Sequence, residues 1–117
     1  MPSKRLIGDR GENAAVSFLK RHGLAILDRN YTFHHGEIDI VAKDGNEIVF
    51  IEVKTRRTSG FGAPEESVTP LKQSIIRRTA EGYVAEKKLE NVSCRFDVVA
   101  IQIGEGTAHV TYFRNAF

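Results

Sequence analysis

The segment GEIDIVAKDGNEIVFIEVKT, residues 36–55, decides the fold of this chain. It contains two apolar runs rich in isoleucine and valine, at 36–42 and 47–55, joined by the turn-forming sequence Asp44-Gly45-Asn46. Nearly continuous apolar runs of this kind are typical of central strands that are covered on both faces. We therefore predict a β-hairpin at the centre of a sheet with a helix on either side.

Charged side chains interrupt both apolar runs. Residues two apart in a strand point the same way, so Glu37 shares a face with Asp39, and Glu52 shares a face with Lys54. The hairpin can then bring Asp39 beside Glu52. A buried salt bridge of either acid with Lys54 is the alternative, but burying ions is costly and an apolar pair is often as stable. A functional site is the better explanation.

Residues 4–22 have the periodicity of an amphipathic helix. Its apolar arc consists of Ile7, Ala14, Ala15, Phe18 and Leu19. Glu12 falls inside this arc, between Val16 and Leu19. A carboxylate that faces a core needs a compensating partner, so Glu12 is a further candidate for the site.

The remaining segments predict one more helix and three more strands. The helix begins at Thr69-Pro70, a cap residue followed by proline, and runs to about Lys88. Its predicted inner arc consists of Leu71, Ile75, Ile76, Ala80 and Tyr83, with Lys72 among them. Strands at 24–31, 93–103 and 108–113 complete the order αβββαββ. We predict an α/β fold, a single domain over residues 1–117 whose mixed five-stranded sheet is flanked by two helices.

The composition is that of an ordinary globular protein. Of its 117 residues, 41% are hydrophobic and 27% are charged, values that exclude a disordered or fibrous protein. No apolar run approaches the roughly 18 residues of a membrane span, and residues 1–5 lead into no apolar signal segment. We expect a cytoplasmic protein with no membrane partner. The single cysteine, Cys94, lies in an apparent strand, where we expect it to be buried and structural.

Basic side chains are grouped along the chain, although the formal net charge is only +2. The groups are Lys4, Arg5 and Arg10; Lys54, Arg56 and Arg57; and Lys72, Arg77 and Arg78. Arg56, Arg57 and the glycine-containing loop at 59–63 directly follow the strand that carries Glu52, so they could follow a phosphate backbone. Lys72 or Gln73 could approach a phosphate from the first turn of the second helix. An ordinary solvated surface is the alternative for all of these groups.

Asp39, Glu52 and Lys54 suit the hydrolysis of a phosphodiester. Two converging carboxylates provide the oxygen ligands that a hard divalent cation such as Mg²⁺ or Mn²⁺ prefers. Such a cation lowers the pKa of a bound water and neutralises charge on the phosphate. A lysine one strand step beyond can orient the attacking water or add positive charge.

Several segments resemble those of known nucleases. The strands GEIDIVA (36–42) and FIEVKT (50–55) resemble the motif of the PD-(D/E)xK nuclease superfamily. Together with Gly11-Glu12 and RFDVVA (95–100), they make nearly the whole chain similar to the YraN-like family of uncharacterised small bacterial proteins. This resemblance implies a restriction-endonuclease-like fold similar to that of archaeal Holliday junction resolvases. It also implies an active site of Glu12, Asp39, Glu52 and Lys54, in which the three carboxylates hold the metal, and, by analogy with the resolvases, a homodimer.

Three other positions could compete for the metal role. Asp97 lies in FDVVA, which echoes IDIVA at 38–42, but no Glu-x-Lys follows it, and we expect it to be a structural partner of Arg95 or of a basic residue near the site. Glu37 could bind the metal or orient a water, or it could be a solvated acid at a strand end. His34 and His35 are adjacent in a turn, where their side chains diverge, so we expect exposed loop histidines and no zinc site.

The sequence thus predicts a divalent-metal-dependent endonuclease acting on DNA, with branched or recombination intermediates as the substrates suggested by the resemblance. The alternative is a non-catalytic nucleic-acid-binding or adaptor protein on the same fold.

Overall fold

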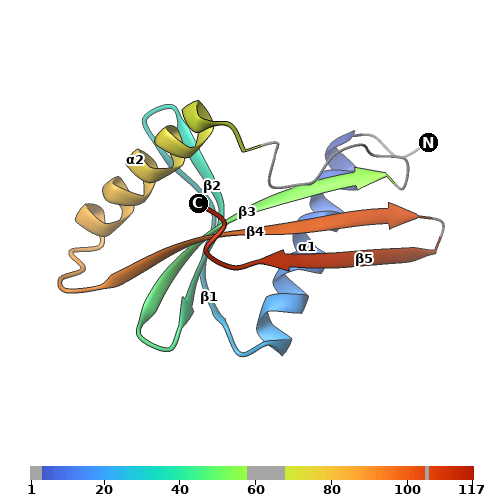
Figure 1. Cartoon of the computed structure of the whole chain (residues 1–117), viewed down its shortest axis with the longest axis horizontal. Coiled ribbons are helices and arrows are strands. Elements are labelled where there is room, and N and C mark those ends of the chain that lie inside the picture. The colour runs from blue at the N-terminus through green and yellow to red at the C-terminus, as the bar shows by residue number, and fades with distance from the viewer. Residues whose placement is uncertain (1–3, 58–67, 105) are drawn as a thin grey trace.

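The computed structural model of this chain describes residues 4–57, 68–104 and 106–117, apart from the side chains of residues 4–9 and 57. The elements are α1 (Lys4–Arg21), β1 (Ala25–Phe33), β2 (Gly36–Asp44), β3 (Glu47–Arg57), α2 (Pro70–Glu86), β4 (Ser93–Gly104) and β5 (Thr107–Phe113) (Figure 1). This order is αβββαββ, so the predicted α/β fold class is confirmed. The loop predicted at 59–63 lies outside the described residues. None of the described helices is long and apolar enough to cross a membrane.

The five strands form one mixed sheet in the order β1-β2-β3-β4-β5. The pair β3–β4 is parallel, and the other three pairs are antiparallel. The parallel pair needs a long crossover, which contains α2, whereas the tight turn at 45–46 joins β2 to β3. The central position of the hairpin strands agrees with the prediction from their apolar runs.

The central hairpin separates into two branches partway along its length. Pairing between β2 and β3 runs from Asp44–Glu47 to Ile40–Ile51 and ends there. Beyond this point, which we call the fork, β2 continues paired with β1 and β3 continues paired with β4. Asp39 and Glu52 are the first residues past the fork on their two strands.

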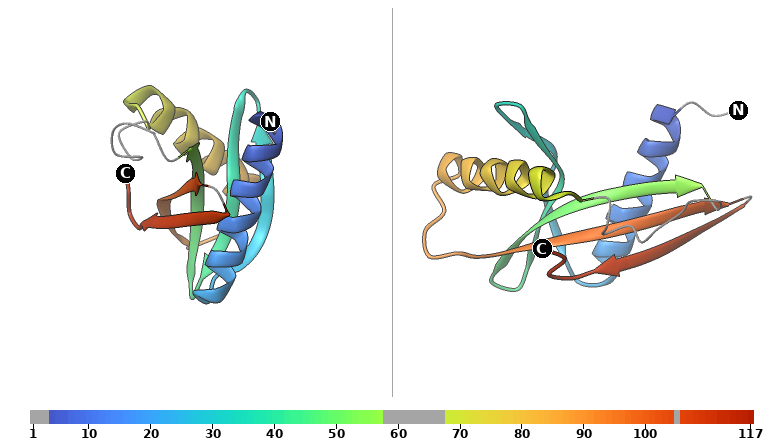
Figure 2. Two further views of the ribbon diagram at one scale, coloured as in Figure 1. Left: turned by 90° about the vertical axis from the view of Figure 1, so that its right-hand side faces the viewer. Right: turned by 45° about the horizontal axis from the view of Figure 1, so that its top comes forward.

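The two helices cover opposite faces of the sheet (Figure 2, left). On the α1 side the buried core contains Ala15, Val16, Leu19, Leu24, Ile40, Ala42, Val49, Ile51, Val99 and Ile101. On the α2 side it contains Ile38, Val41, Ile48, Phe50, Val68, Ile76, Ala80, Tyr83 and Val98. Burial of apolar side chains on both faces of β3 explains its nearly continuous apolar sequence.

Two glycines allow the close packing that shapes the region around the fork. A Cβ atom on Gly11 would overlap the side chain of Thr55, so glycine lets α1 approach β3 just before Glu12. A Cβ atom on Gly36 would overlap the side chain of Thr79, so glycine lets the start of β2 lie directly on α2. Both helices are thereby held against the strands that carry the acidic residues.

Part of the predicted inner arc of α2 was wrong. Ile76, Ala80 and Tyr83 are buried as predicted, but Leu71 is 73% exposed and Ile75 is 41% exposed. The buried face also includes Thr79 and Gly82, which meet the β1–β2 hairpin. The apolar periodicity predicted the wrong face because Thr79 and Gly82, which make the close contacts, are not counted as apolar residues.

The expected burial of Cys94 was also wrong. Cys94 is exposed at the second position of β4, where it lines an open groove with Val92 and with Leu89. It shares a face with buried Ile48, its partner in β3. A strand pattern identifies the face of the sheet but not how far the helix above it extends.

Candidate functional site

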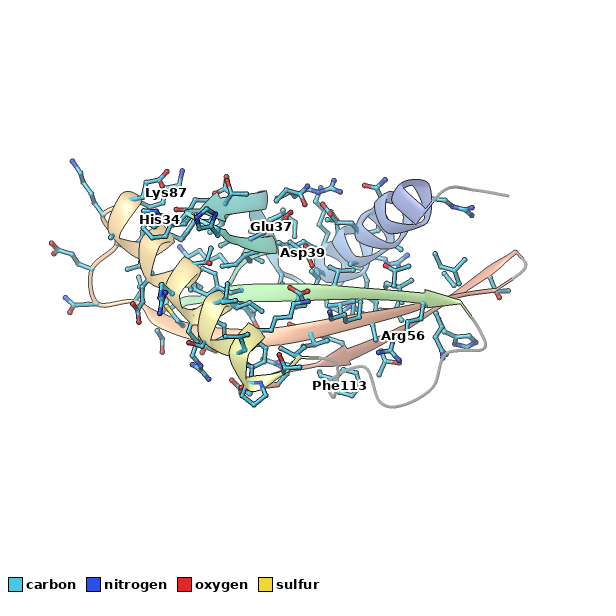
Figure 3. The ribbon with its side chains drawn as sticks, turned by 90° about the horizontal axis from the view of Figure 1, so that it is seen from above. His34, Glu37, Asp39, Arg56, Lys87 and Phe113 are labelled. Carbon is cyan, nitrogen blue, oxygen red and sulfur yellow. The ribbon has the colours of Figure 1, made fainter. Side chains whose placement is uncertain are left out.

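Asp39 bridges the two branches of the fork. Its Oδ2 accepts a hydrogen bond from the backbone N–H of Val53 over 2.8 Å. The carboxylate thus replaces the backbone partner that β3 loses when β2 turns away. Figure 3 shows Asp39 following Glu37 along β2, near the middle of the molecule. The side chain is half-buried, so its charge is poorly solvated.

The pKa of Asp39 is raised from 3.8 to about 7. Burial is the main cause, and the negative charge of Glu52 is the second. Glu37 and Glu12 add smaller effects in the same direction, whereas the N–H of Val53 lowers the pKa. Carboxylates from α1, β2 and β3 therefore all act on Asp39 at the fork.

Glu52 is buried and contacts two lysines. Its Oε1 lies 2.9 Å from Nζ of Lys72 and 3.5 Å from Nζ of Lys54. Lys72 extends from the first turn of α2, which begins at the N-cap Thr69. The predicted pairing of Glu52 and Lys54 on one face of β3 is thus present in the structure, and α2 supplies a second cation.

Lys54 is less basic than an ordinary lysine. Its pKa is lowered by burial and by the adjacent ammonium of Lys72, while the charge of Glu52 opposes this. Only 20% of its side chain is exposed. A desolvated ammonium group next to carboxylates interacts more strongly with a nearby anion than a solvated one does.

Glu12 has the compensating partner that its position in the apolar arc requires. Its Oε1 accepts hydrogen bonds from Nε of Arg29 at 2.9 Å and from Nδ2 of Asn30 at 3.1 Å. Arg29 also donates to Oδ1 of Asn13. The sequence analysis missed Arg29 and Asn30, since only the register of β1 places them beside α1, and no local signal in the sequence identifies them.

The carboxylates are near one another but do not converge on one point. Glu12 is held toward β1 by Arg29, and Glu52 is held toward α2 by Lys72. Within 4–57, 68–104 and 106–117, no three His, Cys, Asp or Glu side chains are arranged to hold a metal ion together. A shared metal would require Glu12 and Glu52 to exchange these basic partners for the cation.

The residues expected to contact nucleic acid occupy different surroundings. Lys72 lies at the site, and Arg56 is half-buried farther along β3, away from Asp39 (Figure 3). Gln73 donates through Nε2 to the carbonyl oxygen of Val68, so its amide stabilises the start of α2. The side chain of Arg57 lies outside the described part of the chain.

Asp97 is a structural partner of Arg95, as expected. The guanidinium of Arg95 donates to both carboxylate oxygens of Asp97 over 3.0–3.1 Å, and both side chains are buried. The hydroxyl of Tyr112 and the backbone N–H of Asn115 also donate to Asp97. Its lone pairs are therefore used within the fold.

The other candidates from the sequence lie on the surface. Glu37, His34 and His35 are exposed. Figure 3 shows His34 at the far end of α2, near Lys87 and away from Asp39. Of these three residues, Glu37 is the one that affects the site, because its negative charge raises the pKa of Asp39.

Comparison with known proteins identifies the family. The model described as "Uncharacterised protein family UPF0102" matches residues 11–101, which include all four predicted active-site residues. A UPF0102 protein of Caldicellulosiruptor saccharolyticus is 45% identical and covers 98% of this chain and 99% of its own length. UPF0102 proteins of Geobacter sulfurreducens and Chlorobaculum parvum are 45% and 51% identical, over 97% and 89% of this chain and 89% and 81% of their own. The YraN-like resemblance is consistent with this match, and the chain belongs to the UPF0102 family.

Proposed function

We propose that this protein is a divalent-metal-dependent endonuclease that hydrolyses DNA phosphodiester bonds at the fork, with branched DNA as its preferred substrate. The observation that carries the proposal is the half-buried Asp39, whose pKa is about 7 because burial and neighbouring carboxylates disfavour its charge. Natural proteins rarely keep poorly compensated acids beside a core unless the site has a function. Two lysines at the same place provide the positive charge that a phosphate requires.

The residues at the fork fit a hard divalent cation in their chemistry. Asp39 and Glu52 provide carboxylate oxygens, which are the ligands that Mg²⁺ and Mn²⁺ prefer. The raised pKa of Asp39 supports this fit, because a crowded carboxyl group gains most when a cation replaces its proton. Glu12 would join them as a third ligand or as the acceptor of a bound water, once it releases Arg29.

When bound, the metal would supply a water of lowered pKa and positive charge beside the scissile phosphate. Asp39 must be deprotonated for this, which the ammonium of Lys72 and the N–H of Val53 favour. Lys54 stabilises the negative charge that develops on the phosphate and orients the attacking water. Lys72, released from Glu52, binds a phosphate oxygen from the α2 side.

The second candidate is a nucleic-acid-binding or adaptor protein on the same fold without catalysis. The ion pairs of Glu12 with Arg29 and of Glu52 with Lys72 favour it, because they satisfy two of the three predicted metal ligands without a cation. In such a protein the lysines alone would bind the phosphate backbone.

Cleavage assays separate the two candidates. The purified protein is incubated with branched, flapped and linear DNA, with Mg²⁺, Mn²⁺ or a chelator. The proposal expects metal-dependent cleavage, reduced by about 100-fold or more in Asp39→Asn and in Lys54→Ala, as when a group that stabilises the transition state is removed. Exposed Glu90→Gln and Lys43→Ala are matched controls that should keep the full activity. If the protein binds DNA but cleaves none of the substrates with either metal, the result would support the adaptor instead.

A further inference from the structure

The sheet continues well beyond the fork. Residues 52–57 of β3, 98–104 of β4 and 107–113 of β5 remain paired and form an extension that we call the arm. Figures 1 and 3 show the arm projecting past the first turn of α2. The arm begins at Glu52 and Lys54, so its surface is continuous with the candidate site.

The two faces of the arm differ in character. The face toward α1 is apolar, with Val53, Val99, Ile101, Ile103 and Val110 packed in or against the core. Beyond a first row of Glu52, Val98 and Phe113, the opposite face carries Lys54, Arg56, Gln102, Thr107, His109 and Thr111, together with the small residues Ala100 and Gly104. Gln102, His109 and Thr111 are exposed, and neither described helix covers them. We call this opposite face the polar face of the arm.

The register arranges the polar face in rows across three strands. Lys54, Ala100 and Thr111 form one row, and Arg56, Gln102 and His109 form the next. Strand geometry separates the rows by about 7 Å and neighbouring strands by about 5 Å. Among the described side chains of the polar face beyond Glu52, none is acidic. Two cations on β3, Lys54 and Arg56, therefore lie beside neutral hydrogen-bonding groups on β4 and β5.

We propose that the polar face of the arm binds the sugar-phosphate backbone of one DNA strand as it leaves the site. Lysine, arginine, glutamine and threonine side chains are the groups that commonly contact phosphate oxygens. Gly104 carries no side chain, which leaves room for the backbone to approach the sheet at the end of β4. A protein partner would instead require an apolar centre on this surface, which Lys54, Gln102 and Thr111 do not provide. The inference rests on the proposed function only in taking DNA as the substrate.

Introducing a negative or a positive charge at Gln102 tests whether the polar face binds DNA. Gln102 is exposed and forms no part of the core, so Gln102→Glu and Gln102→Lys should both fold. We expect Gln102→Glu to weaken DNA binding about 5- to 10-fold and Gln102→Lys to tighten it about 2- to 5-fold, because each charge acts on nearby phosphates. Binding is measured by fluorescence anisotropy with a labelled flapped duplex in chelator, so that no cleavage occurs. Melting temperatures confirm that the variants are folded.

A matched control lies at the other end of the same strand. Ser93 is exposed at the first position of β4, far along the strand from Gln102, so Ser93→Glu should bind DNA like the wild type. Opposite effects of Glu and Lys at Gln102, absent at Ser93, support the proposal. Equal affinities at Gln102, or weakening by both substitutions, would overturn it.

The test distinguishes failure of the arm from failure of the proposed function. If the wild type cleaves DNA in a manner that needs metal and Asp39, while both Gln102 variants bind like the wild type, only the arm is refuted. If the wild type neither binds nor cleaves DNA, the proposed function fails and the arm fails with it.

Discussion

The carboxyl group of Asp39 links the acidity of the site to the stability of the fold. Its pKa is raised to about 7 in the folded protein, whereas in the unfolded chain it returns to about 4. Between these pH values the folded protein binds more protons at this group than the unfolded chain does. The free energy of unfolding therefore falls as the pH rises from about 4 to about 7.

This effect predicts that Asp39→Asn is more stable than the wild type at pH 8 in chelator, by about 1–3 kcal/mol, and similar to it at pH 4. The asparagine has no charge that burial and Glu52 could disfavour. Urea denaturation of both proteins at several pH values measures the difference. Glu90→Gln should follow the wild type throughout. Parallel pH profiles of Asp39→Asn and the wild type would show that the Asp39 carboxyl titrates normally.

Lys72 forms an ion pair with Glu52, so its ammonium group competes with any metal ion for that carboxylate. We predict that Lys72→Ala binds Mn²⁺ about 2- to 5-fold more tightly, which corresponds to the loss of an ion pair that is partly exposed to solvent. Isothermal titration calorimetry at fixed pH measures the affinity. Lys43→Ala removes a similar charge from an exposed part of β2 and should change little. Equal or weaker Mn²⁺ binding in Lys72→Ala would contradict competition at Glu52.

At the scale of elements, the contact between α1 and β3 depends on a glycine. A Cβ atom at Gly11 would meet Oγ1, Cγ2 and Cβ of Thr55. We predict that Gly11→Ala lowers the free energy of unfolding by about 1–3 kcal/mol, as overpacking does, although alanine is the better helix former.

A second substitution provides the control for this contact. Thr55→Ala removes two of the three atoms that the new methyl group would meet, so the double variant Gly11→Ala/Thr55→Ala should recover part of the loss. Denaturation of the two single variants and the double variant gives the coupling energy. Additive losses would mean that the two residues do not clash.

The strands and the central acids could be predicted from the sequence because both depend on local patterns. Asp39, Glu52 and Lys54 interrupt the apolar runs at 36–42 and 47–55. The observed register places Asp39 and Glu52 on either side of the fork. The fork itself could not be predicted, since it arises where β2 leaves β3 to pack on α2 through Gly36. The pairing of Glu12 with Arg29 depends on the same tertiary arrangement.

The face of α2 shows where the pattern fails. Leu71 and Ile75 have the spacing of core residues, yet they lie on the surface, while Thr79 and Gly82 are buried against the hairpin. Apolar periodicity measures hydrophobicity, whereas this contact depends on small size. The wrong expectation for Cys94 has a different cause, because its exposure depends on where the covering helix ends.

For the molecule as a whole, a formal net charge of only +2 means that attraction to DNA depends on where the cations lie. Lys54, Lys72 and Arg56 are placed along one path, from the fork into the arm. A protein that binds DNA through a few such contacts releases few counterions, since each phosphate contact releases about 0.9 cation from a duplex.

We therefore predict that the logarithm of the DNA association constant falls with the logarithm of the salt concentration with a slope between about −2 and −4. Anisotropy titrations between about 50 and 200 mM salt measure this slope in chelator. Gln102→Lys should make the slope more negative by about 1, because it adds one phosphate contact. Lys43→Ala should leave it unchanged, since Lys43 lies on the other side of the fork. A slope near zero would mean that the path from the fork into the arm does not meet the phosphate backbone, and that any binding of DNA involves another surface.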